Sequence, residues 1–354
     1  MAQFSRIAAV TGANKGIGLA IVRNLALQYP SSAFNNGPLL IYLCARDIGK
    51  GKEAVTTLED DAQLKKAKAL AQAGGLTTVK FHKVDINSGN MSDFAGFLEK
   101  EHPEGIDMVI NNAGIAMEGF NIDVVKQTLG CNYYGTLDIS RALLPLIRSG
   151  GRLVNLASMV GHLNSKYSAE IRTAFAESKT VEDVTALMSA FTKAVEEGKE
   201  NERGWPSMGY AVSKSGIVGM TRALALEEKE KGSGVLVNSC CPGFVKTDMT
   251  RQRGQKTVDE GAQTPVLLAC GDIGGTTGEF WQHEKVIECS VPDAPLTLAT
   301  QDLRVFPLLD LARSWNIVRV RGHERVIEEK RFAVAWVYYG FTSHGLDSTH
   351  VLAM

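Results

Sequence analysis

Short apolar runs and longer stretches of helical periodicity alternate along most of the chain. The apolar runs, which we predict to be strands, are Ile7–Val10, Leu39–Ala45, Thr78–Val84, Asp107–Asn111, Arg152–Ala157, Val235–Cys240 and Glu279–Trp281. The stretches that we predict to be helices are Ile17–Leu27, Gly49–Ala73, Met91–Glu101, Ile122–Arg148 and Met208–Lys229. This alternation predicts an α/β fold, a doubly wound parallel sheet with helices on both faces.

Two regions interrupt the alternation. Residues 161–205 are polar, rich in Glu and Lys and without a strand pattern, which predicts a helical insertion. After about Cys289 the alternation ends, and Pro292 and Pro295 are typical of a linker. We therefore predict one domain over residues 1–289 and a C-terminal extension, residues 290–354, whose structure and role the sequence leaves open.

Composition and charge narrow the class of protein. The 354 residues include 44% apolar and 22% charged side chains, as in ordinary soluble globular proteins, and the formal net charge is −1. So small a charge gives no electrostatic case for a nucleic-acid partner or an anionic membrane. The chain shows no signal-peptide pattern and no run of about 20 apolar residues, so we expect a cytoplasmic protein.

The cysteines and histidines give no sign of a metal site. Six cysteines and seven histidines lack the spacing of metal or redox motifs, so we expect no metal. Most cysteines lie in apolar runs, which favours buried, reduced thiols. Whether the adjacent Cys240 and Cys241 are reactive stays open.

A glycine-rich turn follows the first predicted strand. Glycines stand at positions 12, 16 and 18, and Asn14, Lys15 and Ile17 lie among them before a predicted helix. A strand, a glycine turn and a helix N-terminus together make a cradle for phosphate groups. Gly12 would allow the tight turn, Gly16 the approach of a pyrophosphate, and Gly18 the packing of helix on strand. The spacing differs from the Gly-x-Gly-x-x-Gly fingerprint, and an ordinary glycine-containing turn is the alternative.

Tyr210 and Lys214 are the strongest candidates for chemistry. Four residues apart on a predicted helix, they project from the same face. A neighbouring ammonium lowers the pKa of a phenol, which makes tyrosine a usable general acid or base. Together with a nucleotide cradle, the pair indicates an oxidoreductase.

Taken in order, these motifs resemble the short-chain dehydrogenase/reductases. The residues that carry the resemblance are Thr11-Gly12, Gly16, Gly18, Asn111-Asn112-Ala113-Gly114, Ser158, Tyr210, Lys214 and Pro242-Gly243. Three longer stretches resemble the monomeric NADPH-dependent carbonyl reductases: Lys15–Arg23, Gly204–Ser207 and Cys240–Gly243. The resemblance covers roughly residues 5–289 and implies a Rossmann-type fold.

The resemblance implies a catalytic group of four residues. Ser158 and Tyr210 would donate hydrogen bonds to the carbonyl oxygen of a substrate, and Tyr210 would supply the proton. Lys214 would lower the pKa of Tyr210 and bind the nicotinamide ribose. Asn132 would hold a water that relays protons to Lys214.

The resemblance also implies a cofactor site along one edge of the sheet. Asp85 would contact the adenine, and Asn112, Ala113 and Gly114 would lie against the adenosine ribose. One asparagine of that motif would tie adjacent strands together. Pro242 and Gly243 would make a turn, after which the Val245 backbone and Thr247 hold the nicotinamide carboxamide.

The choice of cofactor depends on the residues after the second strand. An acidic residue there would accept hydrogen bonds from a free ribose 2′-hydroxyl, whereas Arg46 suits a 2′-phosphate. Lys15 and Lys50 would add positive charge. The acidic residue Asp47, directly after Arg46, argues against binding of a 2′-phosphate. Related carbonyl reductases nevertheless share the sequence Ala-Arg-Asp. We therefore expect NADPH.

The substrate pocket is less defined by sequence. Met159, Val160, Trp205 and Met249 are candidate pocket walls, but apolar residues at these positions are equally typical of a core. Phe244 stands where related reductases usually have tryptophan, and a smaller aromatic would widen the pocket.

We expect an NADPH-dependent reductase of aldehydes, ketones or quinones. One alternative is an enzyme for one dedicated secondary alcohol or terpenoid-like ketone. Another is a non-catalytic NADP-sensing protein, against which the retained serine, tyrosine, lysine and asparagine argue.

Many members of the family associate with a second subunit through the helices that carry the asparagine and the tyrosine. The insertion at 161–205 would cover that surface and partly wall the active site, so we expect a monomer, unless the insertion is an exposed loop.

Overall fold

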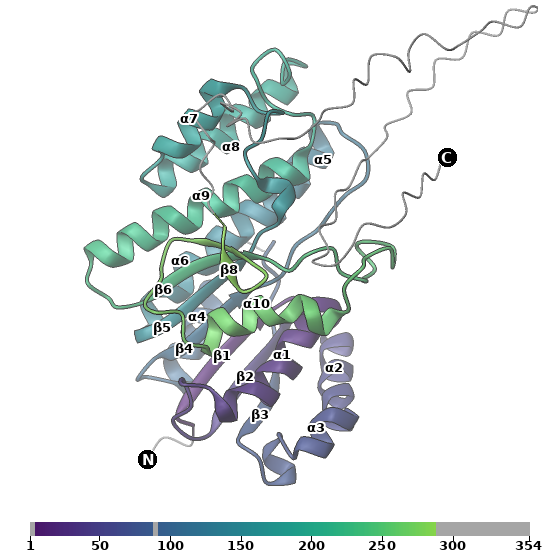
Figure 1. Cartoon of the computed structure of the whole chain (residues 1–354), viewed down its shortest axis with the longest axis vertical. Coiled ribbons are helices and arrows are strands. Elements are labelled where there is room, and N and C mark those ends of the chain that lie inside the picture. The colour runs from purple at the N-terminus through teal and green to yellow at the C-terminus, as the bar shows by residue number, and fades with distance from the viewer. Residues whose placement is uncertain (1–3, 88–90, 288–354) are drawn as a thin grey trace, which may run out of the picture. The chain divides into compact units, whose positions relative to one another are not determined.

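The computed structural model describes residues 4–87 and 91–287 and is built on one sheet (Figure 1). The strand order is β3-β2-β1-β4-β5-β6-β7-β8, and every neighbouring pair is parallel except β7 with β8. The strands are β1 (Arg6–Thr11), β2 (Leu39–Ala45), β3 (Thr77–Lys83), β4 (Ile106–Asn111), β5 (Ile147–Leu156), β6 (Leu236–Cys241), β7 (Phe280–Gln282) and β8 (Lys285–Val286). This order reverses direction between β1 and β4, which is the topology of a doubly wound sheet.

Helices cover both faces of the sheet, as the sequence predicts. One face is covered by α1 (Gly16–Gln28), α2 (Ile48–Asp60), α3 (Ala62–Ala67) and α10 (Val258–Cys270). The other is covered by α4 (Ser92–Glu101), α5 (Ile122–Leu129), α6 (Thr136–Leu143) and α9 (Gly209–Glu230). Strands β2 and β4 are buried along their whole length because helices pack on both sides.

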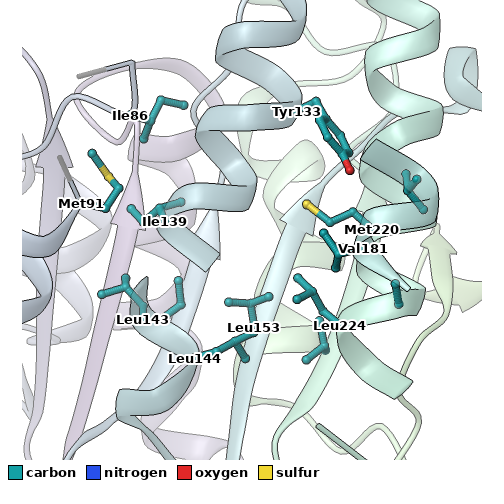
Figure 2. Packing of buried hydrophobic residues seen from close by; sticks show 14 of the residues in the cluster. Ile86, Met91, Tyr133, Ile139, Leu143, Leu144, Leu153, Val181, Met220 and Leu224 are labelled. Carbon is teal, nitrogen blue, oxygen red and sulfur yellow. The ribbon is translucent and has the colours of Figure 1, made fainter. Parts of the chain in front are cut away.

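The core beneath α6 and α9 is continuous with the insertion (Figure 2). Leu153 of β5 lies between the side chains of α6 and those of Met220 and Leu224 on α9. Tyr133 is fully buried in the same cluster, and its hydroxyl is 2.8 Å from the Thr185 hydroxyl of the insertion. A packed core of this kind fixes how α9 sits on the sheet.

The insertion is helical, as predicted, and consists of two helices. They are α7 (Ala169–Glu177) and α8 (Val181–Glu196), and α8 begins with a capping box between Thr180 and Asp183. Helix α8 packs on α5 and α9 through a buried stripe that includes Val184, Met188 and Phe191. Figure 1 shows α7 and α8 beside α9 and α5, on the side away from the sheet.

Two predicted helices are interrupted in the structure. The predicted helix Gly49–Ala73 breaks after Asp60, because the Asp61 carboxylate caps a new helix by accepting from the backbone N–H of Gln63 and Leu64. The predicted helix Ile122–Arg148 contains a π-helical turn, Gly130–Gly135, and ends before β5 begins. Apolar periodicity does not distinguish these local changes of winding from a regular helix.

Helix α10 and strand β8 were not predicted. The start of α10 carries a detectable signal, because Thr257 and Glu260 form a capping box. Pro265 lies inside this helix and obscures its pattern. Strand β8 has two residues, which is too short for a sequence signal. The predicted extension, residues 290–354, lies outside the described residues.

Candidate active site

The glycine turn joins β1 to α1 and needs glycine at three positions, of which Gly16 needs it for its φ of 58°. Gly12 has a φ of 60°, and a Cβ there would lie 2.9 Å from the Cα of Ala113. A Cβ on Gly18 would lie 2.5 Å from both the Asn112 side-chain nitrogen and the Gly12 carbonyl oxygen. A Cβ on Gly16 would meet only Thr247, at 3.6 Å. The turn is thus tight on the strand side and open on the side facing Thr247.

Two asparagines tie the central strands together at this edge. Asn112, after β4, donates from its side chain to the carbonyls of Thr11 and Gly12, at 2.9 and 3.1 Å. Asn111 donates to the Asn155 side chain of β5 at 2.9 Å. The expected asparagine link between adjacent strands is therefore present twice, once from β4 to β1 and once from β4 to β5. The link through Asn112 holds Ala113 and Gly114 against the glycine turn.

The first turn of α9 brings Tyr210 to Ser158. Ser158 follows β5, and its side chain hydrogen bonds with Tyr210. Lys214, one turn further along α9, lies with its ammonium 5.6 Å from the centre of the Tyr210 ring. It is buried and donates to the Leu156 carbonyl at 2.8 Å. Three of the four predicted catalytic side chains thus meet at the carboxyl edge of the sheet.

Burial changes the proton affinities of this group. Burial, with a smaller contribution from the nearby Cys241, raises the pKa of Tyr210 to about 12, although the hydrogen bond with Ser158 opposes this shift. Burial also lowers the pKa of Lys214 to about 8. We expected Lys214 to lower the pKa of Tyr210; instead, desolvation of the phenol dominates and raises it. At neutral pH the phenol therefore holds its proton, and Lys214 is cationic.

Asn132 reaches the same group from the π-helical turn. Its side-chain oxygen accepts from the Ile115 N–H at 2.8 Å, and its nitrogen donates to the Ile115 carbonyl and the Ser213 hydroxyl. A Cβ on Gly114 would lie 3.1 Å from the Asn132 oxygen and 3.7 Å from the Lys214 ammonium. Asn132 therefore lies close to Lys214, in a turn whose irregular winding is common at functional sites.

The predicted adenine end of the site lies at the ends of β2 and β3. Arg46 and Lys50 are exposed, and Arg46 directly follows β2. The Asp47 carboxylate accepts from the backbone N–H of Lys50 at 2.8 Å and so caps α2. Asp85, after β3, accepts from the Asn87 N–H at 3.1 Å. Asp47 therefore has a structural role as the helix cap of α2, which accounts for an acidic residue beside Arg46.

The loop between β6 and α10 closes the other end. Gly243 has a φ of 90°, and a Cβ there would meet the Lys256 side chain at 2.9 Å. Val245 is buried, and its carbonyl accepts from the Thr250 hydroxyl at 2.6 Å. The Thr247 N–H donates to the same hydroxyl at 3.1 Å. Thr250 thus shapes the turn after Pro242 and presents Thr247 toward Gly16.

Exposed apolar side chains gather on the loops around Tyr210. Of the eight large apolar residues that are exposed in the described part of the chain, five lie on these loops: Met117, Val160, Met208, Phe244 and Met249. Phe244 and Met249 are about half exposed. Met159 is half-buried and packs against the cluster of Ala157, Cys241 and Phe280.

Trp205 does not line an open pocket, contrary to our prediction. It is 2% exposed and packs against Phe191, at 5.4 Å between ring centres, and against Phe175 and Tyr167. Its role is to join the insertion to the core. Apolar character alone did not separate a core tryptophan from a pocket wall.

Several contacts at the site involve residues that the sequence did not single out. Asp248 pairs with Lys15, and Ser213 positions Asn132. The Leu156 carbonyl anchors Lys214. Apart from Ser213, which lies between Tyr210 and Lys214, these residues belong to no local motif, and their contacts are recognisable only from the fold.

Within the described residues, no group of His, Cys, Asp or Glu is arranged to hold a metal ion. None of the helices formed by these residues has the length and apolar content needed to cross a membrane.

The five described cysteines are free and buried. Burial raises the pKa of the Cys240 thiol well above its usual value, which disfavours the reactive thiolate.

Known proteins match most of this chain. A family profile described as short chain dehydrogenase matches residues 41–183 and 195–258. Carbonyl reductase (NADPH) 1 of Mus musculus is 38% identical over 292 residues, which are 79% of this chain and 97% of that protein. The chain belongs to the short-chain dehydrogenase family.

Other similar proteins agree with this assignment. Carbonyl reductase (NADPH) 3 of Rattus norvegicus is 38% identical over 76% of this chain and 92% of its own length. The structure of salutaridine reductase from Papaver somniferum has a TM-score of 0.66 and 26% identity, and covers 78% of this chain and 99% of that one. The resemblance to the short-chain dehydrogenases and the Rossmann-type fold are thus confirmed, and they place the motifs in a known structural context.

Proposed function

We propose that this short-chain dehydrogenase is an NADPH-dependent carbonyl reductase that converts aldehydes, ketones or quinones to alcohols or hydroquinones. The observation that carries the proposal is the meeting of Ser158, Tyr210 and Lys214 beside an open glycine turn. The similarity to the mouse and rat carbonyl reductases supports both the reaction and the cofactor.

The residues present fit a bound NADPH. The side of Gly16 that faces Thr247 is open, which leaves room for a pyrophosphate at the N-terminus of α1. Arg46 and Lys50 are exposed and available to a 2′-phosphate, and Asp47 is occupied as a helix cap. We assign Gly12, Asn14, Gly16, Ile17, Gly18 and Lys15 to the pyrophosphate end. Asp85 and Asn112–Gly114 would hold the adenosine, and Pro242, Gly243, Val245 and Thr247 the nicotinamide.

In the proposed mechanism, bound NADPH supplies a hydride to the substrate carbonyl carbon. Ser158 and Tyr210 donate hydrogen bonds to the carbonyl oxygen, where negative charge develops. Tyr210, protonated at neutral pH because burial raises its pKa to about 12, then transfers its proton to that oxygen. Lys214, buried and cationic below about pH 8, stabilises the phenolate that remains. Asn132 lies where it can connect Lys214 to water.

The exposed apolar loops favour a substrate with apolar surface. Phe244, Met249 and Met208 lie near the entrance and give an adaptable wall. A dehydrogenase or reductase for one dedicated secondary alcohol or terpenoid-like ketone is the second candidate. The fold similarity to salutaridine reductase, a reductase by name, keeps that candidate open.

The decisive experiment follows NADPH absorbance with a panel of quinones, aldehydes and ketones, with NADH alongside. Tyr210→Phe removes the donated proton and should reduce kcat by about 10²–10⁴-fold while NADPH binding persists. Turnover that survives in this variant would contradict the role of Tyr210. NADPH binding without any carbonyl turnover would favour the dedicated-substrate or sensor alternatives.

We propose that the protein is a monomer. Helix α8 packs on α5 and α9, and Tyr133, next to Asn132, hydrogen bonds with Thr185 of that helix. The buried residues Phe191 and Trp205 hold the insertion in place. Sedimentation equilibrium should give the mass of one chain, and a dimer mass would contradict the proposal.

We further propose that residues 1–289 act as a single reductase domain and that the protein is cytoplasmic. The described residues belong to one compact unit, which supports the first part. Free, buried thiols in every described cysteine are typical of a reducing compartment and support the second. A truncated chain, residues 1–289, should retain full kcat, and cell fractionation would test the compartment.

A further inference from the structure

A cavity lies away from the proposed catalytic residues. It has a volume of about 700 Å³ and runs between α7, the C-terminal half of α9 and the backbone that leads into β7. Ser215 lines it, one residue after Lys214. Successive helical residues project about 100° apart, so this wall faces away from the Tyr210 side of α9. Among the described residues that line the cavity, none is a proposed catalytic or cofactor residue.

The cavity combines apolar walls with a positively charged margin. Leu163, Phe175, Val218 and Phe280 contribute apolar surface. Leu226, on the same wall, is 39% exposed and is one of the few large apolar residues exposed away from Tyr210. A volume of this size is within the range of small-molecule sites, roughly 300–1,000 Å³.

Three cations line the cavity: Arg172, Arg222 and Lys229, against one carboxylate, that of Glu279. Arg222 donates through one nitrogen to the carbonyls of Phe175, Ala176 and Ser178, so it is held at the C-terminal end of α7. These bonds use only one of its three guanidinium nitrogens. The excess of positive charge beside apolar walls suits an anion with an apolar tail.

We propose that this cavity is a second ligand site, and that it binds an amphipathic carboxylate, with the chain along Leu226 and Val218 and the carboxylate at Arg172. The site is built by the insertion, because α7 forms one wall. It is independent of the proposed carbonyl reduction and needs no turnover to be detected.

The test uses dodecanoate as the probe and isothermal titration calorimetry on the full chain saturated with NADPH. Dodecanoate should bind the natural protein, and dodecan-1-ol should bind more weakly because it lacks the charge. Arg172→Gln should weaken dodecanoate binding roughly tenfold, the scale of one charge-assisted hydrogen bond. Leu226→Ser should also weaken binding, through loss of apolar contact.

Lys193→Gln is the matched control, because it removes an exposed charge from α8 of the same insertion and does not line the cavity. The affinity of the Lys193→Gln variant for dodecanoate should equal that of the natural protein. Thermal unfolding of each variant checks that the fold is intact. The proposal is overturned if dodecanoate does not bind, if dodecan-1-ol binds equally well, or if Arg172→Gln and Leu226→Ser leave the affinity unchanged.

Discussion

The ammonium of Lys15 lies 2.6 Å from the carboxylate of Asp248 and joins the glycine turn to the loop after β6. Both side chains are about two-thirds exposed. The pair holds the pKa of Asp248 below its usual value. Lys15 was expected to serve a cofactor phosphate, so the partner that it already has must compete with that phosphate.

Removal of this competition should improve cofactor binding. Asp248→Asn frees Lys15, and the Kd for NADPH should fall roughly two- to fivefold at low salt, since exposed ion pairs are weak. The gain should shrink at high salt, because screening acts on both partners. Fluorescence titration of NADPH measures this effect, with Glu197→Gln on the insertion as control. Weaker NADPH binding in Asp248→Asn would mean that the pair orders the site instead.

The proton affinities at the site predict a pH profile. Carbonyl reduction needs protonated Tyr210 and cationic Lys214. Tyr210 stays protonated up to about pH 12, whereas Lys214 loses its proton near pH 8. We expect kcat for reduction to fall as pH rises through about 8. Alcohol oxidation needs the Tyr210 phenolate, which gains population only as the pH approaches about 12, so its rate should still be rising at pH 10. Initial rates in both directions between pH 6 and 10 measure these limbs, and a reductive rate that is flat to pH 10 would contradict the assignment to Lys214.

Asp107 connects the amino ends of three central strands. It is fully buried, pairs with Arg6 of β1 and Arg148 of β5, and accepts from the Ile7 N–H at 2.7 Å. Asp107→Asn leaves two guanidinium groups without their shared partner and should lower the free energy of unfolding by about 3–5 kcal/mol.

Urea denaturation measures this loss. Asp60→Asn, which breaks an exposed pair with Lys65, is the control and should change stability by less than about 0.5 kcal/mol. If the two variants lose similar amounts of unfolding free energy, the burial of Asp107 does not account for the importance of its ion pairs.

Gly18 and Gly96 should respond to alanine in opposite ways. A Cβ on Gly18 would collide with the Asn112 side chain and the Gly12 carbonyl, so Gly18→Ala should cost about 1–3 kcal/mol and weaken NADPH binding. A Cβ on Gly96, in the middle of α4, would meet nothing within 4 Å. Gly96→Ala should therefore stabilise the protein by about 0.5–1 kcal/mol. Thermal unfolding compares the two, and equal behaviour would contradict the close packing at Gly18.

The sequence predicted the strands of the sheet well because buried parallel strands form continuous apolar runs. The observed β2 has the predicted bounds, and β1, β4 and β6 differ by at most one residue at each end, whereas β5 begins five residues before its predicted start. The helices were predicted less exactly where winding changes within one apolar pattern. The π-helical turn at Asn132 and the break at Asp61 depend on hydrogen bonds that periodicity does not reveal.

By itself, the sequence determined the family resemblance, the α/β fold and the candidate site residues that the structure brings together, because these depend on short motifs and on the alternation of strand and helix patterns. Only the tertiary structure decided what lies between elements. It turned Trp205 from a pocket wall into a core residue, made Asp47 a helix cap and paired Lys15 with Asp248. It also raised the proton affinity of Tyr210, because desolvation depends on all neighbours of a group and not on its own segment of chain.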